Sequence, residues 1–251
     1  MPKKTRRELL GILGGLGPMA SVYFYELLTA HTAAEKDSDH IDLILSSRAS
    51  TPDRTAFILG ESKDDPAPVM CEEARRLECA GATLIAIPCN TAHFFYRQIK
   101  DAVSVPVINI IEETVKMLAR SGTRKIGVLA TEGTVRSGAY KSVAEQYGIG
   151  YAVPCDADQE TLNHLIYGQI KRGDAPDTEA FSRVCGHLRE DGCDRLVLGC
   201  TELSLIGKAV RHDPHIFADS LEILACRTIL ACHKTPVGFP DWFAAIPLLT
   251  E

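Results

Sequence analysis

The sequence contains one short pattern twice, and this repeat limits the folds that the chain can adopt. The segments Gly81 to Cys89 and Gly192 to Cys200 each contain a glycine, a strand-like apolar run and a cysteine, and they lie 111 residues apart. Gly11-Ile12-Leu13 and Gly127-Val128-Leu129 are also alike, at an offset of 116 residues. Two offsets this close predict a duplicated fold.

Apolar runs of strand length alternate with helical patterns along the chain. We expect strands over residues 9–13, 41–46, 84–87, 105–110 and 124–130, and helices over residues 19–32, 69–80, 91–101, 112–121 and 137–147. Helices that alternate with buried strands cover both faces of a parallel sheet. The pattern therefore predicts an α/β protein of two pseudo-symmetric doubly wound domains, with the active site in the cleft between them.

The repeat also predicts where the two domains divide. Residues 216–233 match residues 107–117 and are expected to pack back on the first half. We therefore expect residues 1–111 plus 213–251 to form the first domain and residues 112–212 to form the second. The tail, residues 234–251, has no counterpart in the repeat, and the sequence does not place it.

The composition indicates a globular protein with a small-molecule partner. The chain has 251 residues, of which 45% are hydrophobic and 24% are charged, and its net charge is −6. Its Lys and Arg residues are scattered, so we do not expect nucleic-acid binding. No apolar run reaches the roughly 18 residues of a membrane span, and the basic start, residues 3–7, does not resemble a cleavable signal. We therefore expect a cytoplasmic protein with no membrane partner.

Cys89 and Cys200 differ from the other cysteines in their surroundings. The chain has nine cysteines and no Cys-x-x-Cys pair, so free thiols are expected. These two stand in matching positions of the repeat, after a strand and before a helical segment. Ligands of doubly wound folds bind at the carboxyl ends of strands. The two thiols are therefore expected to flank one cleft.

This arrangement predicts a proton-transfer reaction. A helix N-terminus stabilises a thiolate, and its N–H groups bind a carboxylate together with the side chains of Asn90, Thr91 and Thr201. One thiolate can then remove the α-proton of an amino acid while the opposed thiol protonates the other face. The reaction requires no metal, pyridoxal phosphate or nicotinamide, so no cofactor is expected.

Several alternatives remain open from the residues alone. Either cysteine by itself is more often a buried structural thiol. A zinc site of Cys89, His93 and Cys200 lacks an obvious fourth ligand, so no metal site is predicted. Residues 15–20 fit G-x-G-x-x-A, but Pro18 removes an N–H group and no acidic residue ends the second strand, which argues against a nicotinamide dehydrogenase. A non-catalytic protein that binds an acidic ligand is a further alternative.

Four motifs resemble the aspartate/glutamate racemase superfamily, on its aspartate racemase side. They are Gly14-Gly15-Leu16-Gly17-Pro18, Pro52-Asp53-Arg54-Thr55, Pro88-Cys89-Asn90-Thr91-Ala92-His93 and Gly199-Cys200-Thr201-Glu202-Leu203. The resemblance covers the chain to about residue 233. It implies a two-base racemase without pyridoxal phosphate that acts on an acidic amino acid, and a homodimer. Related glutamate racemases read Gly-Cys-Thr-His at the last motif, so Glu202 favours aspartate as substrate, with glutamate or a broad range as alternatives.

The resemblance also assigns roles to residues around the cysteines. It implies that Arg54 and Lys171 receive the side-chain carboxylate, and that the glycine loop lets backbone approach the substrate. Ser137 and Tyr140 fall in the substrate-facing loop of the second domain, and residues 48–51 depart from the pattern of relatives, which affects substrate choice. The predicted site comprises Cys89 and Cys200 as catalytic residues, with Gly14, Gly15, Gly17, Arg54, Asn90, Thr91, Thr134, Lys171, Thr201 and Glu202 as substrate-binding residues.

Overall fold

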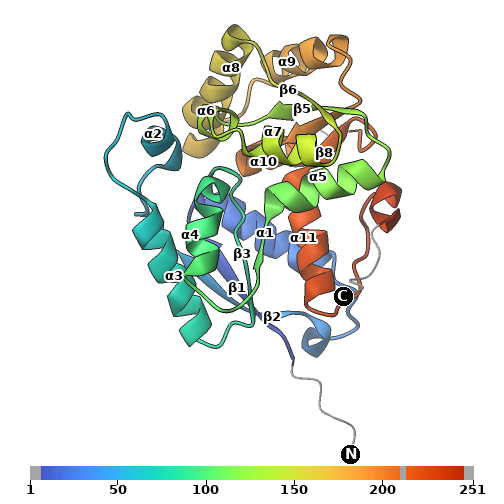
Figure 1. Cartoon of the computed structure of the whole chain (residues 1–251). Helices are drawn as coiled ribbons and strands as arrows, with labels where there is room; N and C mark the ends of the chain where they lie inside the picture. Colours follow the sequence, from blue (N-terminus) through green and yellow to red (C-terminus); the bar gives the residue numbers. More distant parts are fainter. Residues whose placement is uncertain (1–6, 210–212, 246–251) are drawn as a thin grey trace, which may run out of the picture.

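The computed structural model describes residues 7–209 and 213–245. Within these residues the strands form two parallel sheets of four strands each, in the orders β2-β1-β3-β4 and β6-β5-β7-β8. The first sheet lies in the lower half of the molecule in Figure 1 and the second in the upper half. The strands are β1 (Leu9–Gly14), β2 (Asp42–Ser47), β3 (Leu84–Ala86), β4 (Val107–Ile108), β5 (Lys125–Leu129), β6 (Gly150–Ala152), β7 (Arg195–Leu198) and β8 (Phe217–Asp219).

Helices connect the parallel strands, as the alternating pattern predicts. In the first half they are α1 (Pro18–Ala30), α2 (Arg54–Ile58), α3 (Ala67–Cys79), α4 (Tyr96–Asp101) and the 3-10 turns η1 (Asp37–Asp39) and η2 (Thr91–Phe95). After β4, the last strand of the first sheet, the helical elements are α5 (Ile110–Arg120), α6 (Glu132–Arg136), α7 (Ala139–Gln146), α8 (Asp156–Asn163), the π-helical η3 (His164–Gln169), η4 (Ile170–Arg172), α9 (Thr178–Glu190), α10 (Thr201–Ala209), α11 (Ser220–Ala231) and η5 (Asp241–Ala245).

The two sheets have the same strand order, which confirms the predicted pair of doubly wound halves. In each sheet the first strand in sequence is flanked by the second and third, and the fourth lies at the edge. Helices begin where short polar side chains accept hydrogen bonds from the first backbone N–H groups. Asp53, Asn109, Thr131 and Asp219 act in this way at the starts of α2, α5, α6 and α11.

The last strand belongs to the second sheet, which differs from the expected division at residue 213. β8 pairs in parallel with β7, with Leu198 opposite Asp219. The reason lies in the connection, because β7, α10 and β8 form one strand-helix-strand unit that returns to the neighbouring position of the same sheet. The following helix crosses back, since α11 packs against α1 of the first half and against α5.

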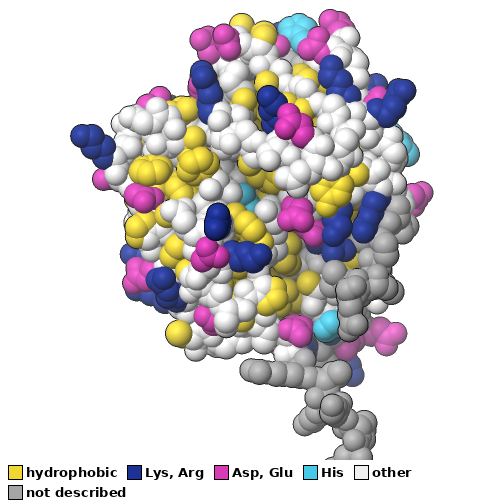
Figure 2. Space-filling view, in the orientation of Figure 1, with side chains coloured by type: hydrophobic (Ala, Val, Ile, Leu, Met, Phe, Trp, Pro, Cys, Tyr) yellow, Lys and Arg dark blue, Asp and Glu magenta, His cyan; other side chains and the backbone are white. Residues whose placement is uncertain are grey.

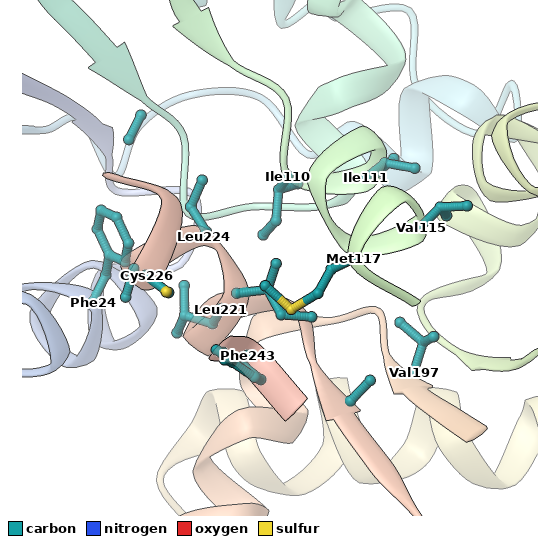
Figure 3. Packing of buried hydrophobic residues seen from close by; sticks show 14 of the residues in the cluster. Phe24, Ile110, Ile111, Val115, Met117, Val197, Leu221, Leu224, Cys226 and Phe243 are labelled. Atoms are coloured by element: carbon teal, nitrogen blue, oxygen red, sulfur yellow. The ribbon is translucent and has the colours of Figure 1, made fainter. Parts of the chain in front are cut away.

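One hydrophobic core runs through both halves along α5 and α11. It contains Leu10 of β1 and Val128 of β5, together with buried residues of both helices. Figure 3 shows Leu221 and Leu224 of α11 between Phe24 of α1 and Met117 of α5. The two sheets are therefore joined by a packed, largely apolar layer on this side of the molecule.

Part of the tail also has a defined place. Thr32, after α1, forms an antiparallel bridge with Pro236, and the N–H of Val237 donates to the carbonyl of His31. Phe243 of η5 is buried in the shared core. The tail to residue 245 is thus held against the end of α1, whereas residues 246–251 lie outside the described part of the chain.

The surface shows mixed charge. On the face in Figure 2, Lys and Arg side chains are interspersed with Asp and Glu. No helix among the described residues is both long enough and apolar enough to cross a membrane.

Candidate active site

Cys89 and Cys200 line one small cavity between the two halves of the molecule. Each follows the carboxyl end of a strand, β3 and β7, and the two side chains are 5% and 4% exposed. The cavity measures about 10 Å³ as the space open to the centre of a water molecule, roughly what one water requires. The predicted pair of thiols therefore shares one closed pocket, which a larger ligand enters only if the halves or their loops separate.

Burial in the closed cavity changes the thiol pKa values that the helix N-termini alone would predict. The segment after Cys89 is the five-residue 3-10 turn η2 rather than a full α-helix, and α10 follows Cys200. Burial raises the pKa of Cys89 and raises the pKa of Cys200 well above its ordinary value. The expected lowering of the thiol pKa values is therefore not found in this closed state, because removal from water outweighs the favourable dipoles.

Arg54 lies at the first turn of α2, buried against the cavity. Its Nη2 donates to the carbonyl of Leu16 at 2.7 Å, and its Nη1 donates to the carbonyl of Pro52 at 3.0 Å. Its Nε is buried without a hydrogen-bond partner. Two sides of the guanidinium are thus fixed by backbone, while a third donor remains available for a carboxylate.

Lys171 faces the same cavity from the second half. Its Nζ lies 3.8 Å from Oε1 of Glu202 and 4.4 Å from the ring centre of Tyr167. The hydroxyl of Tyr167 donates to Oγ1 of Thr55 at 2.8 Å, which links the two halves across the cavity. Lys171 is therefore positioned by an anion and an aromatic face rather than projecting into solvent.

Glu202 contacts the second cysteine directly. Its Oε2 accepts a hydrogen bond from Sγ of Cys200 at 3.0 Å and one from the hydroxyl of Thr201 at 3.4 Å. Both Glu202 and Thr201 line the cavity and are buried. After burial itself, the negative charge of Glu202 contributes most to the raised pKa of Cys200.

Asn90 lines the cavity, but its side chain is already engaged. Its amide nitrogen donates to the hydroxyl of Ser220 at 3.0 Å, and its amide oxygen accepts from the hydroxyl of Tyr140 at 2.7 Å. Asn90 therefore ties the first cysteine motif to α11 and to α7. Tyr140, which the sequence suggested as substrate-facing, is 1% exposed and supports Asn90.

Three threonine hydroxyls form a closed group beside Cys89. Thr91 lies 3.0 Å from Thr131 and 2.9 Å from Thr134, and the hydroxyls of Thr131 and Thr134 are 3.1 Å apart. Thr91 and Thr131 line the cavity, whereas Thr134 stands behind them. Ser137, whose hydroxyl donates to the carbonyl of Thr134, is part of the same support.

The glycine loop borders a second, larger space next to the cavity. This chamber of about 260 Å³ is lined by Gly15 and Gly17, and also by Arg54, Lys171 and Glu202. Gly15 has a φ of 82°, and a side chain there would clash with the backbone of residue 48. Gly14 lines neither space and instead packs against Ser21.

His93 supports the first motif from within the core. Its Nδ1 lies 2.8 Å from the carbonyl of Cys89, and its Nε2 accepts from the N–H of Ile110 at 3.2 Å. These partners assign the ring proton to Nδ1. Among the described residues, no group of three or more His, Cys, Asp or Glu is arranged to hold a metal ion.

Sequence reasoning missed five residues of the cavity wall: Leu16, Asp53, Thr55, Thr131 and Tyr167. Leu16, Asp53 and Thr55 lie inside motifs that the sequence had singled out. Tyr167 precedes Lys171 by four residues, a spacing that places two side chains on one helical face and could have indicated it. Thr131 follows a buried strand of the second half, where site residues are expected in such folds.

Fold and site together define an α/β protein of two similar halves, each with a parallel sheet. A buried pair of thiols and two cations surround one polar cavity between the halves. The family model described as Asp/Glu/hydantoin racemase matches residues 13–225. The chain belongs to this racemase family.

Known relatives carry several substrate names. The structure of aspartate racemase from Picrophilus torridus has a TM-score of 0.80 and 30% identity, covering 95% of this chain and 98% of that one. The broad specificity amino-acid racemase RacX of Bacillus subtilis is 28% identical over 88% of this chain and 96% of its own length. Glutamate racemase from Aquifex pyrophilus is 33% identical over 54% of each chain.

Proposed function

We propose that this enzyme interconverts L- and D-aspartate with Cys89 and Cys200 as its two catalytic bases. A thiolate on one side removes the proton from the α-carbon, and the thiol on the other side protonates the opposite face. The observation that carries the proposal is the meeting of these two thiols, from equivalent positions of the two halves, in one cavity. Neither a metal nor an organic cofactor has a step in this scheme.

The charges around the cavity support an acidic substrate. Arg54 keeps an unpaired buried Nε, and Lys171 adds a second cation. A guanidinium with an unused Nε–H donor suits a carboxylate, so we assign the side-chain carboxylate to Arg54 with Lys171 beside it. The α-carboxylate is assigned to the N-terminal ends of η2 and α10, near Thr91 and Thr201.

Catalysis in this scheme requires the cavity to open and then close. The 10 Å³ of the closed cavity cannot hold an amino acid, whereas the adjoining chamber of about 260 Å³ can. The chamber and the cavity share Arg54, Lys171 and Glu202, which makes the chamber the natural route of entry. Closure then removes water from the reacting groups and strengthens their interactions with the substrate.

Glutamate, or a broad range of amino acids, is the second candidate substrate. The relatives differ in their named specificity, and the chamber offers room for a side chain longer than that of aspartate. A protein that only binds an acidic ligand is a further alternative, which the exchange assay below separates from an enzyme.

We also propose, on family likeness, that the enzyme is a cytoplasmic homodimer. Sedimentation velocity of the purified chain tests the dimer.

Exchange of the α-proton in deuterated buffer tests the reaction directly. Proton NMR should show loss of the α-proton signal of L- and D-aspartate, and polarimetry should show racemisation, with no added cofactor. Cys89→Ala and Cys200→Ala should each reduce turnover at least about a thousandfold. Cys185→Ala, which changes a buried cysteine away from the cavity, is the matched control and should remain active.

The outcomes distinguish the candidates. Faster exchange of glutamate than of aspartate would assign the second substrate, and full activity of both cavity variants would reject the two-thiol mechanism. Binding of aspartate that survives in the double variant, without exchange in the wild type, would indicate a binding protein instead.

A further inference from the structure

The carboxylate of Glu202 contacts two functional groups of the cavity at once. This residue is the second of α10, and its side chain is 8% exposed. Oε2 accepts the hydrogen bond from Sγ of Cys200 at 3.0 Å, while Oε1 lies 3.8 Å from Nζ of Lys171. Both oxygens are therefore directed at groups of the site rather than at solvent.

The loop after β1 leaves space for this carboxylate. Gly17 has a φ of −119°, a backbone conformation that any residue adopts. A Cβ at this position would nevertheless lie 2.5 Å from Oε1 of Glu202. Glycine therefore leaves room here for the carboxylate, and a side chain at this position would push Glu202 away from where it stands.

The two thiols differ in the charged group that affects each of them most. Beside Cys200 stands the anion of Glu202, which favours the protonated thiol. At Cys89 the largest charge effect is that of the Arg54 cation, which favours the thiolate, as do the N–H of Ala92 and the cation of Lys171. The anion of Glu202 opposes the thiolate at Cys89 too, but by less than Arg54 favours it. The titratable and charged groups that line the cavity around Cys200 and Glu202 are Asp53, Arg54, Cys89, Tyr167 and Lys171.

We propose that Glu202 is a positioning residue that keeps Cys200 protonated and oriented, so that the substrate-bound site holds a thiolate at Cys89 and a thiol at Cys200. The inference rests on the proposed racemase function, because a two-base reaction starts from one thiolate and one thiol. Cys89 takes the α-proton and becomes a thiol, while Cys200 gives its proton to the opposite face and becomes a thiolate. The reverse reaction starts from the state just formed, so the pair carries one proton throughout.

In Glu202→Gln, racemase activity should be lost at a lower pH on the alkaline side of its pH profile. The alkaline limb of kcat/KM reports loss of the second proton of the pair, which the proposal places on Cys200. Removing the adjacent charge should move this limb to lower pH by at least about one unit and leave the acid limb in place. L- and D-aspartate have equal free energies in water, so kcat/KM and its shift must be the same for both enantiomers.

Alkylation of the thiols gives a readout that needs no substrate. Iodoacetamide labelling is followed at each cysteine by peptide mass spectrometry, with the exposed Cys79 and Cys155 as internal references. In Glu202→Gln, labelling of Cys200 at neutral pH should accelerate about tenfold, while labelling of Cys89 changes less than about twofold. Lys171→Met removes the cation beside Glu202 and should slow the labelling of Cys200. This effect on the labelling rate is opposite to that of Glu202→Gln.

These measurements separate failure of this proposal from failure of the proposed function. Unchanged Cys200 labelling in folded Glu202→Gln would overturn the role of Glu202, whatever the substrate is. Gly17→Ala displaces the same carboxylate without removing it and should accelerate Cys200 labelling, as Glu202→Gln does. It therefore tests the role of Glu202 if the glutamine variant does not fold. Absence of racemase activity with the expected labelling pattern would instead point to the substrate assignment.

Discussion

Replacing His93 by glutamine tests whether a neutral buried imidazole holds the first cysteine motif in place. His93 is 6% exposed, and its ring bridges the carbonyl of Cys89 and the N–H of Ile110. Burial lowers its pKa from 6.5 to about 4. A second ring proton would remove the acceptor that Ile110 uses and would place a charge in a dry interior.

The sign and size of the effect follow from the two pKa values. The folded value lies below the unfolded one, so His93 contributes stability that is present above pH 6.5 and is lost as the pH falls towards 4. At about 1.36 kcal/mol for each pKa unit, the loss reaches about 2 kcal/mol between about pH 7.5 and about pH 5. His93→Gln lacks this group, so the difference in unfolding free energy, wild type minus variant, should shrink by the same amount.

Urea denaturation followed by circular dichroism measures this difference at each pH. Two half-buried carboxyls act with the opposite sign, because removal from water raises the pKa of Asp219 to about 6 and that of Glu222 to about 8. Their stability contributions are present at low pH and are lost as the pH rises through those values. Both groups occur in wild type and variant, so they cancel in the difference. A difference that stays constant within about 0.5 kcal/mol across the range would refute the neutral, buried state of His93.

Three further changes test the neighbouring contacts. Arg54→Lys loses the guanidinium fork and should raise KM for aspartate at least about tenfold with a smaller change in kcat, and an unchanged KM in steady-state assays would contradict the assignment. Tyr167→Phe removes the hydroxyl that donates to Thr55, so the unfolding free energy should fall by about 1 kcal/mol. Alkylation of the cavity cysteines should also become faster, and equal alkylation rates would argue that this contact does not hold the cavity closed. Gly15→Ala forces a side chain into a positive φ and against the backbone at Arg48, so denaturation should show a loss of more than about 1 kcal/mol, and wild-type stability would contradict it.

Much of the fold was accessible from the sequence because the repeat and the hydrophobic periods agree. The strands at Leu9–Gly14 and Lys125–Leu129 lie close to their predicted ranges, and both sheets have the same order. The partner of β8 was not accessible, because a short apolar run before a helix does not say which of two similar sheets it joins. The π-helical turn at His164–Gln169 was also missed, since its residues have an ordinary helical pattern.

The candidate site was only partly predictable, for a physical reason. Cys89 and Cys200 stand out because strand ends and helix starts can be located from local patterns. The partners of Asn90 cannot be located in this way, since Ser220 is 130 residues away and Tyr140 is 50 residues away. The pKa of a thiol likewise depends on how far the cleft closes, which no local pattern describes.

The shared core and the closed cavity together indicate how such a site becomes reactive. α5 and α11 fix the halves to one another through a largely apolar layer, so opening is expected away from it, where Tyr167 meets Thr55 and Gly133 lets α6 approach α2. In the closed cavity, burial raises the pKa of both thiols and so favours their neutral form. An amino acid carries an ammonium group beside its α-carbon, and a cation within about 4–6 Å of a thiol favours the thiolate. The substrate itself is therefore expected to supply the charge that makes Cys89 a base, after closure has removed the water that would otherwise weaken this interaction.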